Sequence, residues 1–134
     1  MTPAEARRRF AAARVARLAT VSGAGVPHLV PVTFAVEGDV VYTAVDAKPK
    51  RSTALRRLAD VAENPRVSLL VDFYDDDWSR LWWARADGLA RVVPPEAAPA
   101  ARAAALLAGR YAPFVLAGPA LLVDVVRWSG WSAG

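Results

Sequence analysis

The sequence predicts a mainly β protein, with an antiparallel, barrel-like sheet and short helices at its rims. Six strand-like segments and three helix-like segments follow in the order α-βββ-α-ββ-α-β, without the regular strand–helix alternation of a parallel sheet. Ten prolines and eight glycines divide the chain into short elements. At 134 residues, of which 54% are hydrophobic, the chain is expected to form one domain, residues 1–134, around a single core.

Three segments have helical patterns. Residues 1–14 hold the N-terminal helix, because Thr2 can cap it, Pro3 suits its first turn and Glu5 can bond back to the cap. Residues 94–110 hold a helical insertion before the last strand. The middle helix, Ser52–Glu63, is amphipathic. Its inner stripe is expected to be Leu55, Leu58, Ala59 and Ala62, with Arg56, Arg57, Asp60 and Glu63 facing water.

The strands show alternating or apolar runs bounded by turn residues. The second run is apolar on both faces and is expected to be buried on both sides. Glu37-Gly38-Asp39 is a tight turn, so the third run should return beside the second as a hairpin, and Gly88 is expected to mark a bulge. The predicted strands are Val15–Val21, Pro27–Val36, Val40–Val45, Arg66–Tyr74, Leu81–Val93 and Leu121–Trp128.

Two lysines stand out in a chain whose other long cations are all arginine. Lys48 and Lys50 precede Arg51 on a loop stiffened by Pro49, and Ser52 can cap the helix that follows. Three close cations repel one another unless an anion joins them, and a helix N-terminus adds N–H donors and partial positive charge. We therefore predict a site for phosphate or polycarboxylate here. The alternative is an exposed basic turn.

Side chains suited to catalysis or metal binding are scarce. The absence of cysteine excludes disulfides, thiolate zinc sites and a cysteine nucleophile. His28 is the single histidine, so no histidine metal site is expected, and it is expected to be a satisfied strand residue rather than a proton donor. The acidic run Asp75-Asp76-Asp77 lacks the later ligands of a calcium loop. If the protein is an enzyme, a bound cofactor must supply the difficult chemistry.

Charge and hydropathy exclude further classes of partner. The start of the chain has no secretory pattern, and no apolar run approaches the roughly 20 residues that cross a bilayer, so a cytoplasmic protein without membrane contact is expected. The net charge of +4 comes from scattered arginines. Nucleic-acid binding is the weaker alternative, since its candidate residues do not form one stripe on the first helix. Those candidates are Arg7, Arg8, Arg9, Arg14 and Arg17.

Several segments together resemble the pyridoxamine 5'-phosphate oxidase-like split β-barrel superfamily, over roughly residues 15–132. Gly25–Phe34 is similar to its second strand, and Val41–Arg51 to its third strand and phosphate loop. Asn64–Asp72 is similar to the following strand, and Asp77–Gly88 to the long strand that meets the partner subunit. The closing Arg127–Ser132 is similar to an actinobacterial branch that depends on the deazaflavin coenzyme F-420.

The resemblance implies an FMN-binding type of split β-barrel that forms a homodimer, with cofactor sites at the subunit interface. It implies an oxidoreductase that uses coenzyme F-420 to pass hydride to a small conjugated substrate, such as a quinone, an enone or a tetrapyrrole. FMN-using oxidases carry Ser-Arg-Lys where this chain has Ala47-Lys48-Pro49, which favours F-420 over FMN. The alternatives are a non-catalytic carrier of F-420 or FMN, and an FMN-dependent oxidase-like enzyme.

The resemblance also implies roles for individual residues. Lys48, Lys50, Arg51 and Ser52 are expected to hold the cofactor phosphate. Pro31, Val32, Thr33 and Thr43 are expected to lie along the ring, with Trp82, Trp83 and Trp131 contributed by the neighbouring subunit.

Alternation along a strand constrains the tryptophans independently. Trp82 and Trp83 are adjacent and must face opposite ways, so one belongs to the core and the other to an interface or a ligand. For Trp128 and Trp131, a core position and a ring contact are equally compatible with the sequence. Arg80 and Arg85 are expected to form ion pairs that are solvated or lie between subunits.

Overall fold

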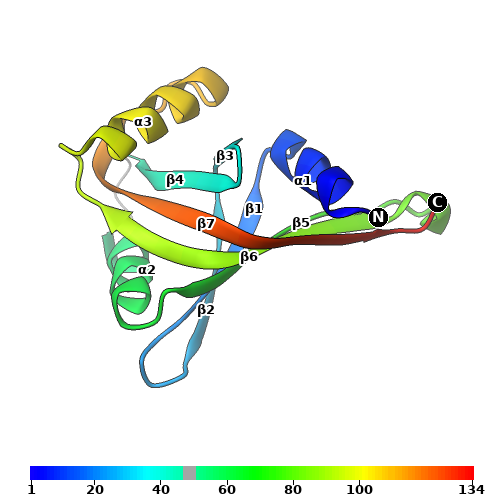
Figure 1. The fold of residues 1–134 in the computed structure, drawn as a ribbon, viewed down its shortest axis with the longest axis horizontal. Coiled ribbons are helices and arrows are strands. Elements are labelled where there is room, and N and C mark those ends of the chain that lie inside the picture. The colour runs from blue at the N-terminus through cyan, green and yellow to red at the C-terminus, as the bar shows by residue number, and fades with distance from the viewer. Residues whose placement is uncertain (47–50) are drawn as a thin grey trace.

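The computed structural model describes residues 1–46 and 51–134, which form one seven-stranded antiparallel sheet with three α-helices (Figure 1). The strand order is β2-β1-β5-β6-β7-β4-β3. The sheet curves without closing, because no hydrogen-bonded pairing joins the edge strands β2 and β3 among the described residues.

The elements are α1 Pro3–Ala12, β1 Ala16–Val21, β2 Pro27–Val32, β3 Ala35–Glu37, β4 Val40–Asp46, α2 Arg51–Glu63, β5 Arg66–Phe73, the 3₁₀ helix η1 Trp78–Arg80, β6 Trp82–Val93, α3 Ala98–Arg110 and β7 Leu116–Ser132.

Local signals in the sequence correctly placed many of these elements. All three helices and the antiparallel sheet are confirmed. Thr2 Oγ1 accepts the N–H of Glu5 at 3.2 Å and caps α1, which ends at Ala12 rather than near Arg14. The bulge is confirmed as a register shift at Gly88, where a Cβ atom would clash with the carbonyl oxygen of Asp124.

The prediction of one strand over Pro27–Val36 is wrong. Its two halves, β2 and β3, lie at opposite edges of the sheet, so the order is α-ββββ-α-ββ-α-β. The backbone at the break bonds to side chains instead of a neighbouring strand: Thr33 O accepts from Thr43 Oγ1 at 2.9 Å, and the Tyr111 hydroxyl donates to Phe34 O at 2.8 Å. Nor is β2 buried on both sides, because Leu29 is 68% exposed.

The predicted orientation of α2 is also wrong in part. Asp60, expected in water, is only 4% exposed, whereas Ala59 and Ala62, expected inside, are exposed. Leu58 faces the core as expected, and Val61 rather than an alanine joins it there. The helix is therefore rotated about its axis relative to the expected stripe, and the carboxylate of Asp60 points to the sheet.

The last strand is longer than the predicted Leu121–Trp128. It pairs with β6 along nearly its whole length, from Trp82 opposite Ser132 to Val93 opposite Ala120. In Figure 1 these two strands form a long bent ribbon, with α1 and α3 on one side of it and α2 on the other.

Two groups of buried residues make up the core. The first is formed by residues of α1, α2 and the sheet, and in it Phe10 packs against Phe34 and Trp128 with ring centroids 4.9 and 5.3 Å away. The second lies under α3 and includes Leu107 and Leu122. Within the part of the chain that the structure describes, no helix combines the length and apolarity needed to cross a bilayer.

Candidate functional site

The side of the sheet that faces away from the first core group carries exposed apolar residues among paired charges. We call it the outer face; strands β2, β1, β5, β6 and β7 contribute to it through alternate residues. Register pairs Ala19 with Leu29 and Trp83 with Trp131 across it. Exposed apolar residues gathered on one face are typical of an interaction site. The outer face presents Arg17, Ala19, Leu29, Pro31, Ser68, Leu70, Asp72, Trp83, Arg85, Asp87 and Trp131.

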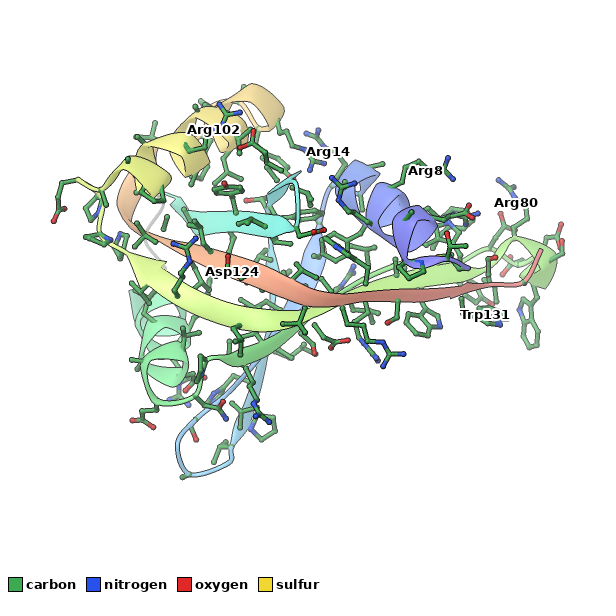
Figure 2. All side chains as sticks on the ribbon, viewed as in Figure 1. Arg8, Arg14, Arg80, Arg102, Asp124 and Trp131 are labelled. Carbon is green, nitrogen blue, oxygen red and sulfur yellow. The ribbon has the colours of Figure 1, made fainter. Side chains whose placement is uncertain are left out.

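One end of the outer face is hollowed into an aromatic pocket of about 370 Å³. Leu81 follows η1 at its rim, and Asp72 and Arg85 are its charged residues. In Figure 2, Trp131 projects from the end of β7 on the side of the sheet opposite α1. The pocket brings together all three tryptophans that were predicted to contact a ring. Its lining is Leu70, Asp72, Phe73, Tyr74, Leu81, Trp82, Trp83, Arg85 and Trp131.

The tryptophans of β6 face opposite sides of the sheet, as alternation requires. Trp82 packs against the first core group, with the Arg9 guanidinium 5.4 Å from its ring centroid. Trp83 faces outward, with the Arg85 guanidinium at 5.6 Å. On β7, Trp128 is a core residue and Trp131 is 48% exposed. The pocket therefore has Trp83 and Trp131 as its outward aromatic walls.

Polar side chains cross the middle of the outer face in a fixed arrangement. Asp87 accepts from Ser68 Oγ at 2.5 Å and from Arg85 Nε at 2.9 Å. Arg17 lies 3.6 Å from Asp72. A second cavity, of about 350 Å³, lies beside the aromatic pocket and shares Leu70 and Asp72 with it. The charged residues thus pair within the face, which leaves its apolar area available for contacts.

The other residues predicted to line the ring lie in different environments. Pro31 is exposed on β2, whereas Val32 is buried. Thr43 has no exposed surface and bonds to the Thr33 carbonyl. Their contacts with a ring remain predictions.

The predicted phosphate contacts fall between β4 and α2 in the sequence. Lys48 and Lys50 fall outside the described residues. Arg51 and Ser52 begin α2, and their side chains are likewise outside the described part. The phosphate site therefore remains a prediction from the sequence.

The arginines weighed for nucleic-acid binding engage nearby acceptors. Arg7 Nε donates to the Gly38 carbonyl at 2.7 Å, and Arg8 and Arg9 both reach Glu5. Arg14 donates to the carbonyl of Arg110 at 2.8 Å. The contact of Arg7 ties α1 to the β3–β4 turn, whereas those of Arg8 and Arg9 lie within the helix.

A buried polar network between α2 and the β1–β2 hairpin was missed by sequence reasoning. Asp60 Oδ2 accepts from Thr20 Oγ1 at 2.8 Å and lies 2.6 Å from His28 Nδ1. The other ring nitrogen of His28, Nε2, lies 2.8 Å from Arg56 Nη1. A stripe drawn through Leu58 and Val61 would have placed Asp60 at its edge, and this was the available signal.

The electrostatics of Asp60 follow from these contacts. Burial by itself raises the pKa of this carboxyl, but hydrogen bonds from Thr20 and His28 and the charges of His28 and Arg56 outweigh it and lower the pKa below the usual value. The next turn of α2 adds a further link, since Glu63 Oε2 accepts the N–H of Gly23 at 2.7 Å. The hairpin β1–β2 is thus fastened to α2 at two carboxylates.

Comparison with known proteins agrees with this architecture. The family model of pyridoxamine 5'-phosphate oxidase matches residues 2–126. No curated protein matches the sequence.

Solved structures share the fold over almost the whole chain. A conserved hypothetical protein of Mycobacterium tuberculosis superposes with a TM-score of 0.71 at 23% identity, covering 99% of this chain and 86% of that one. An FAD-binding protein of Mesorhizobium loti gives 0.70 at 22%, covering 97% and 94%. HutZ, the heme storage protein of Vibrio cholerae, gives 0.72 at 15%, covering 98% and 95%. At these identities the likeness is one of fold, the split barrel with its open sheet.

Proposed function

Because the chain belongs to the pyridoxamine 5'-phosphate oxidase family, we propose that it binds the deazaflavin coenzyme F-420 and passes hydride to a small conjugated substrate. The observation that carries the proposal is the aromatic pocket with its outward tryptophans, Trp83 and Trp131. A flat tricyclic ring requires apolar walls with a few polar groups at the rim, and the pocket offers both. The Ala47-Lys48-Pro49 sequence and the closing Arg127–Ser132 segment favour F-420 over FMN.

The residues present fit such a cofactor. The pocket supplies aromatic surface, and Arg85 is held at its rim by Trp83 and Asp87. Lys48 and Lys50 supply the charge that a phosphate would neutralise, with the N-terminus of α2 following in sequence. When bound, a deazaflavin supplies a ring carbon that accepts or delivers hydride.

The protein's own part in this reaction is to bind, orient and exclude water. Trp83 and Trp131 provide surfaces for stacking, and the fixed Arg85 places a positive charge at the rim of the pocket. His28 has both ring nitrogens engaged by Asp60 and Arg56, so we assign it no proton transfer to substrate. No protein nucleophile is required, because a bound deazaflavin ring would itself supply the hydride chemistry.

The proposal includes a homodimer built on the outer face. Its exposed apolar residues, led by Leu29 and Leu70, surround paired charges, as at interfaces between subunits. A second copy seated there would cover the aromatic pocket and complete a cofactor site from both chains. We expect Leu70→Arg to convert a dimer to a monomer in light scattering coupled to size-exclusion chromatography. Val115→Arg, exposed but off this face, is the control and should leave the dimer intact.

Cofactor binding is tested by titrating the purified protein with F-420 and, separately, with FMN, followed by absorbance. Replacing Trp131 with Ala should weaken binding about ten-fold, since stacking on an aromatic side chain is worth roughly 1–3 kcal/mol. Trp78→Ala is the matched control, because Trp78 is exposed on η1 and does not line the pocket. If neither cofactor binds, the proposal fails. If Trp78 and Trp131 variants weaken binding equally, the pocket is not the site.

The predicted phosphate contacts have their own test. The double change Lys48→Ala with Lys50→Ala should weaken cofactor binding by about 2–4 kcal/mol if both ammonium groups contact phosphate. Unchanged affinity would remove these lysines from the site while leaving the aromatic pocket in place.

A carrier that binds the cofactor without turnover is the second candidate. The likeness in fold to a heme storage protein supports it. The two candidates separate in a screen that follows oxidation of reduced F-420 in the presence of quinones, enones and tetrapyrroles. Tight binding with no oxidation of the cofactor would favour the carrier, and FMN binding alone would favour an FMN-dependent oxidase-like enzyme.

A further inference from the structure

The hydrogen bonds around His28 fix its protonation. Arginine can only donate, so the 2.8 Å contact with Arg56 Nη1 requires that His28 Nε2 be an unprotonated acceptor. The proton of the neutral ring then sits on Nδ1, where it is donated to Asp60 Oδ2 at 2.6 Å. These two contacts therefore assign His28 the neutral Nδ1–H tautomer.

Protonation of His28 would break its contact with Arg56 and keep its contact with Asp60. A proton on Nε2 removes the acceptor for Arg56 and places two cations side by side. The contact between Nδ1–H and Asp60 would persist and strengthen as an ion pair. Arg56 lies in the N-terminal half of α2 and Asp60 in its C-terminal half, so the two halves should respond differently.

The surroundings of His28 contain few other charges among the described residues. Asp60 and Arg56, both on α2, are the charged groups that contact it. Thr20, directly opposite His28 in the β1–β2 register, donates to the same Asp60 oxygen. Glu63 bonds to the turn of the hairpin at Gly23 rather than to the ring.

We propose that Thr20, Asp60, His28 and Arg56 form a latch that positions the N-terminal half of α2 only while His28 is neutral. His28 is then a positioning residue. Because α2 begins at Arg51, beside the predicted phosphate contacts, the latch would couple pH to cofactor affinity; this last step rests on the proposed function. The measurements compare pH 8 with pH 5, the range over which proteins use histidine as a switch.

The first test does not depend on any ligand. The single histidine gives one set of signals in a long-range ¹H–¹⁵N correlation spectrum, and at pH 8 these should show the Nδ1–H tautomer. Amide hydrogen exchange, corrected for the intrinsic effect of pH, should show protection of Arg56, Arg57 and Leu58 falling about five-fold from pH 8 to pH 5. That is the effect of losing one net hydrogen bond. Protection at Val61 and Glu63 should stay constant.

Variants separate the latch from general destabilisation. His28→Gln should abolish the pH response, and Arg56→Gln should give low protection at every pH. Arg57→Gln is the matched control. Arg57 is next to Arg56 in the sequence but has no hydrogen bond to His28, so this variant should keep the pH response of the wild type. An Nε2–H tautomer, or protection that does not change with pH in the wild type, would overturn the latch.

The second test measures FMN and F-420 affinity at pH 8 and pH 5. The latch predicts weaker binding at pH 5 in the wild type and a smaller change in His28→Gln. Equal pH dependence in both proteins would overturn the coupling. If neither cofactor binds at either pH, the proposed function fails, and the exchange data alone decide the latch.

Discussion

Helices α1 and α2 both cover the sheet, but different kinds of interaction attach them to it. Beneath α1 lies the fully buried Phe10, which packs on Phe34 and Trp128. Beneath α2 lies Val61 together with a buried carboxylate, Asp60. The first attachment is mainly apolar, with a hydrogen bond from Arg7 to the Gly38 carbonyl beside it, whereas the second depends on protons and charges.

The two attachments should therefore differ in their sensitivity to pH. Apolar contacts such as those of α1 do not titrate, so this end of the sheet should be insensitive to pH. The attachment of α2 depends on the state of Asp60 and His28. The responsive helix is also the one that follows the basic loop.

The largest expected effect is at α1. Phe10→Ala should lower the free energy of unfolding by about 3–5 kcal/mol, because it opens a cavity beside the rings of Phe34 and Trp128. Urea denaturation measures this, with Phe73→Ala, a partly exposed residue, as a control that should lose about 1 kcal/mol. A loss below 1 kcal/mol for Phe10→Ala would mean that α1 is not held by its apolar face.

The corresponding change at α2 should have a smaller effect. Asp60→Ala leaves Thr20 and His28 without their shared acceptor and should lower the free energy of unfolding by about 2–3 kcal/mol. Asp76→Ala, on the exposed acidic loop, should stay within about 0.5 kcal/mol of the wild type. Similar values for the two variants would contradict the role given to the buried carboxylate.

Acid should loosen α2 before α1. The folded-state pKa of Asp60 lies below its value in the unfolded chain, which is about 3.9. The stability it contributes is therefore fully present above that value and is lost as pH falls through the folded-state pKa. The stability difference between wild type and Asp60→Asn should shrink as pH falls below about 4. A difference that grows below about pH 4 would reverse the assigned sign.

The smallest effect is expected at the start of α1. Thr2→Ala removes the cap on the Glu5 N–H and should lower the free energy of unfolding by about 1 kcal/mol. Ser132→Ala, at the far end of the chain, should change it by less than about 0.5 kcal/mol. If capping mattered more than Phe10, the attachment of α1 would be local rather than tertiary.

The sequence was sufficient for those parts of the fold that rest on local rules. The alternation of Val67, Leu69 and Val71 placed β5, and Gly88 placed the bulge. The break between β2 and β3 was not predictable in this way. At the break, the Phe34 carbonyl accepts a hydrogen bond from Tyr111, which lies 77 residues away along the chain.

The candidate site was predicted in part for the same reason. Alternation placed Trp82 and Trp83 on opposite faces, but only the register of β6 with β7 brings Trp131 beside Trp83. Asp60 was expected in water because a carboxylate is rarely buried without partners. Those partners, Thr20 and His28, come from a hairpin more than 30 residues earlier, so no local sequence pattern predicts them.

The strand order has a consequence for how the chain is assembled during synthesis. The hairpins β1–β2 and β3–β4 emerge first from the ribosome, yet they lie at opposite borders of the finished sheet. Among the described residues, β4 gains its second neighbour only from β7, the final strand to be made. Until β7 is made, the outer edge of β4 in the nascent β3–β4 hairpin has no strand to pair with. Unpaired strand edges of this kind are prone to aggregate, and chaperones shield them. Completion of the last strand should act as the commitment step of folding.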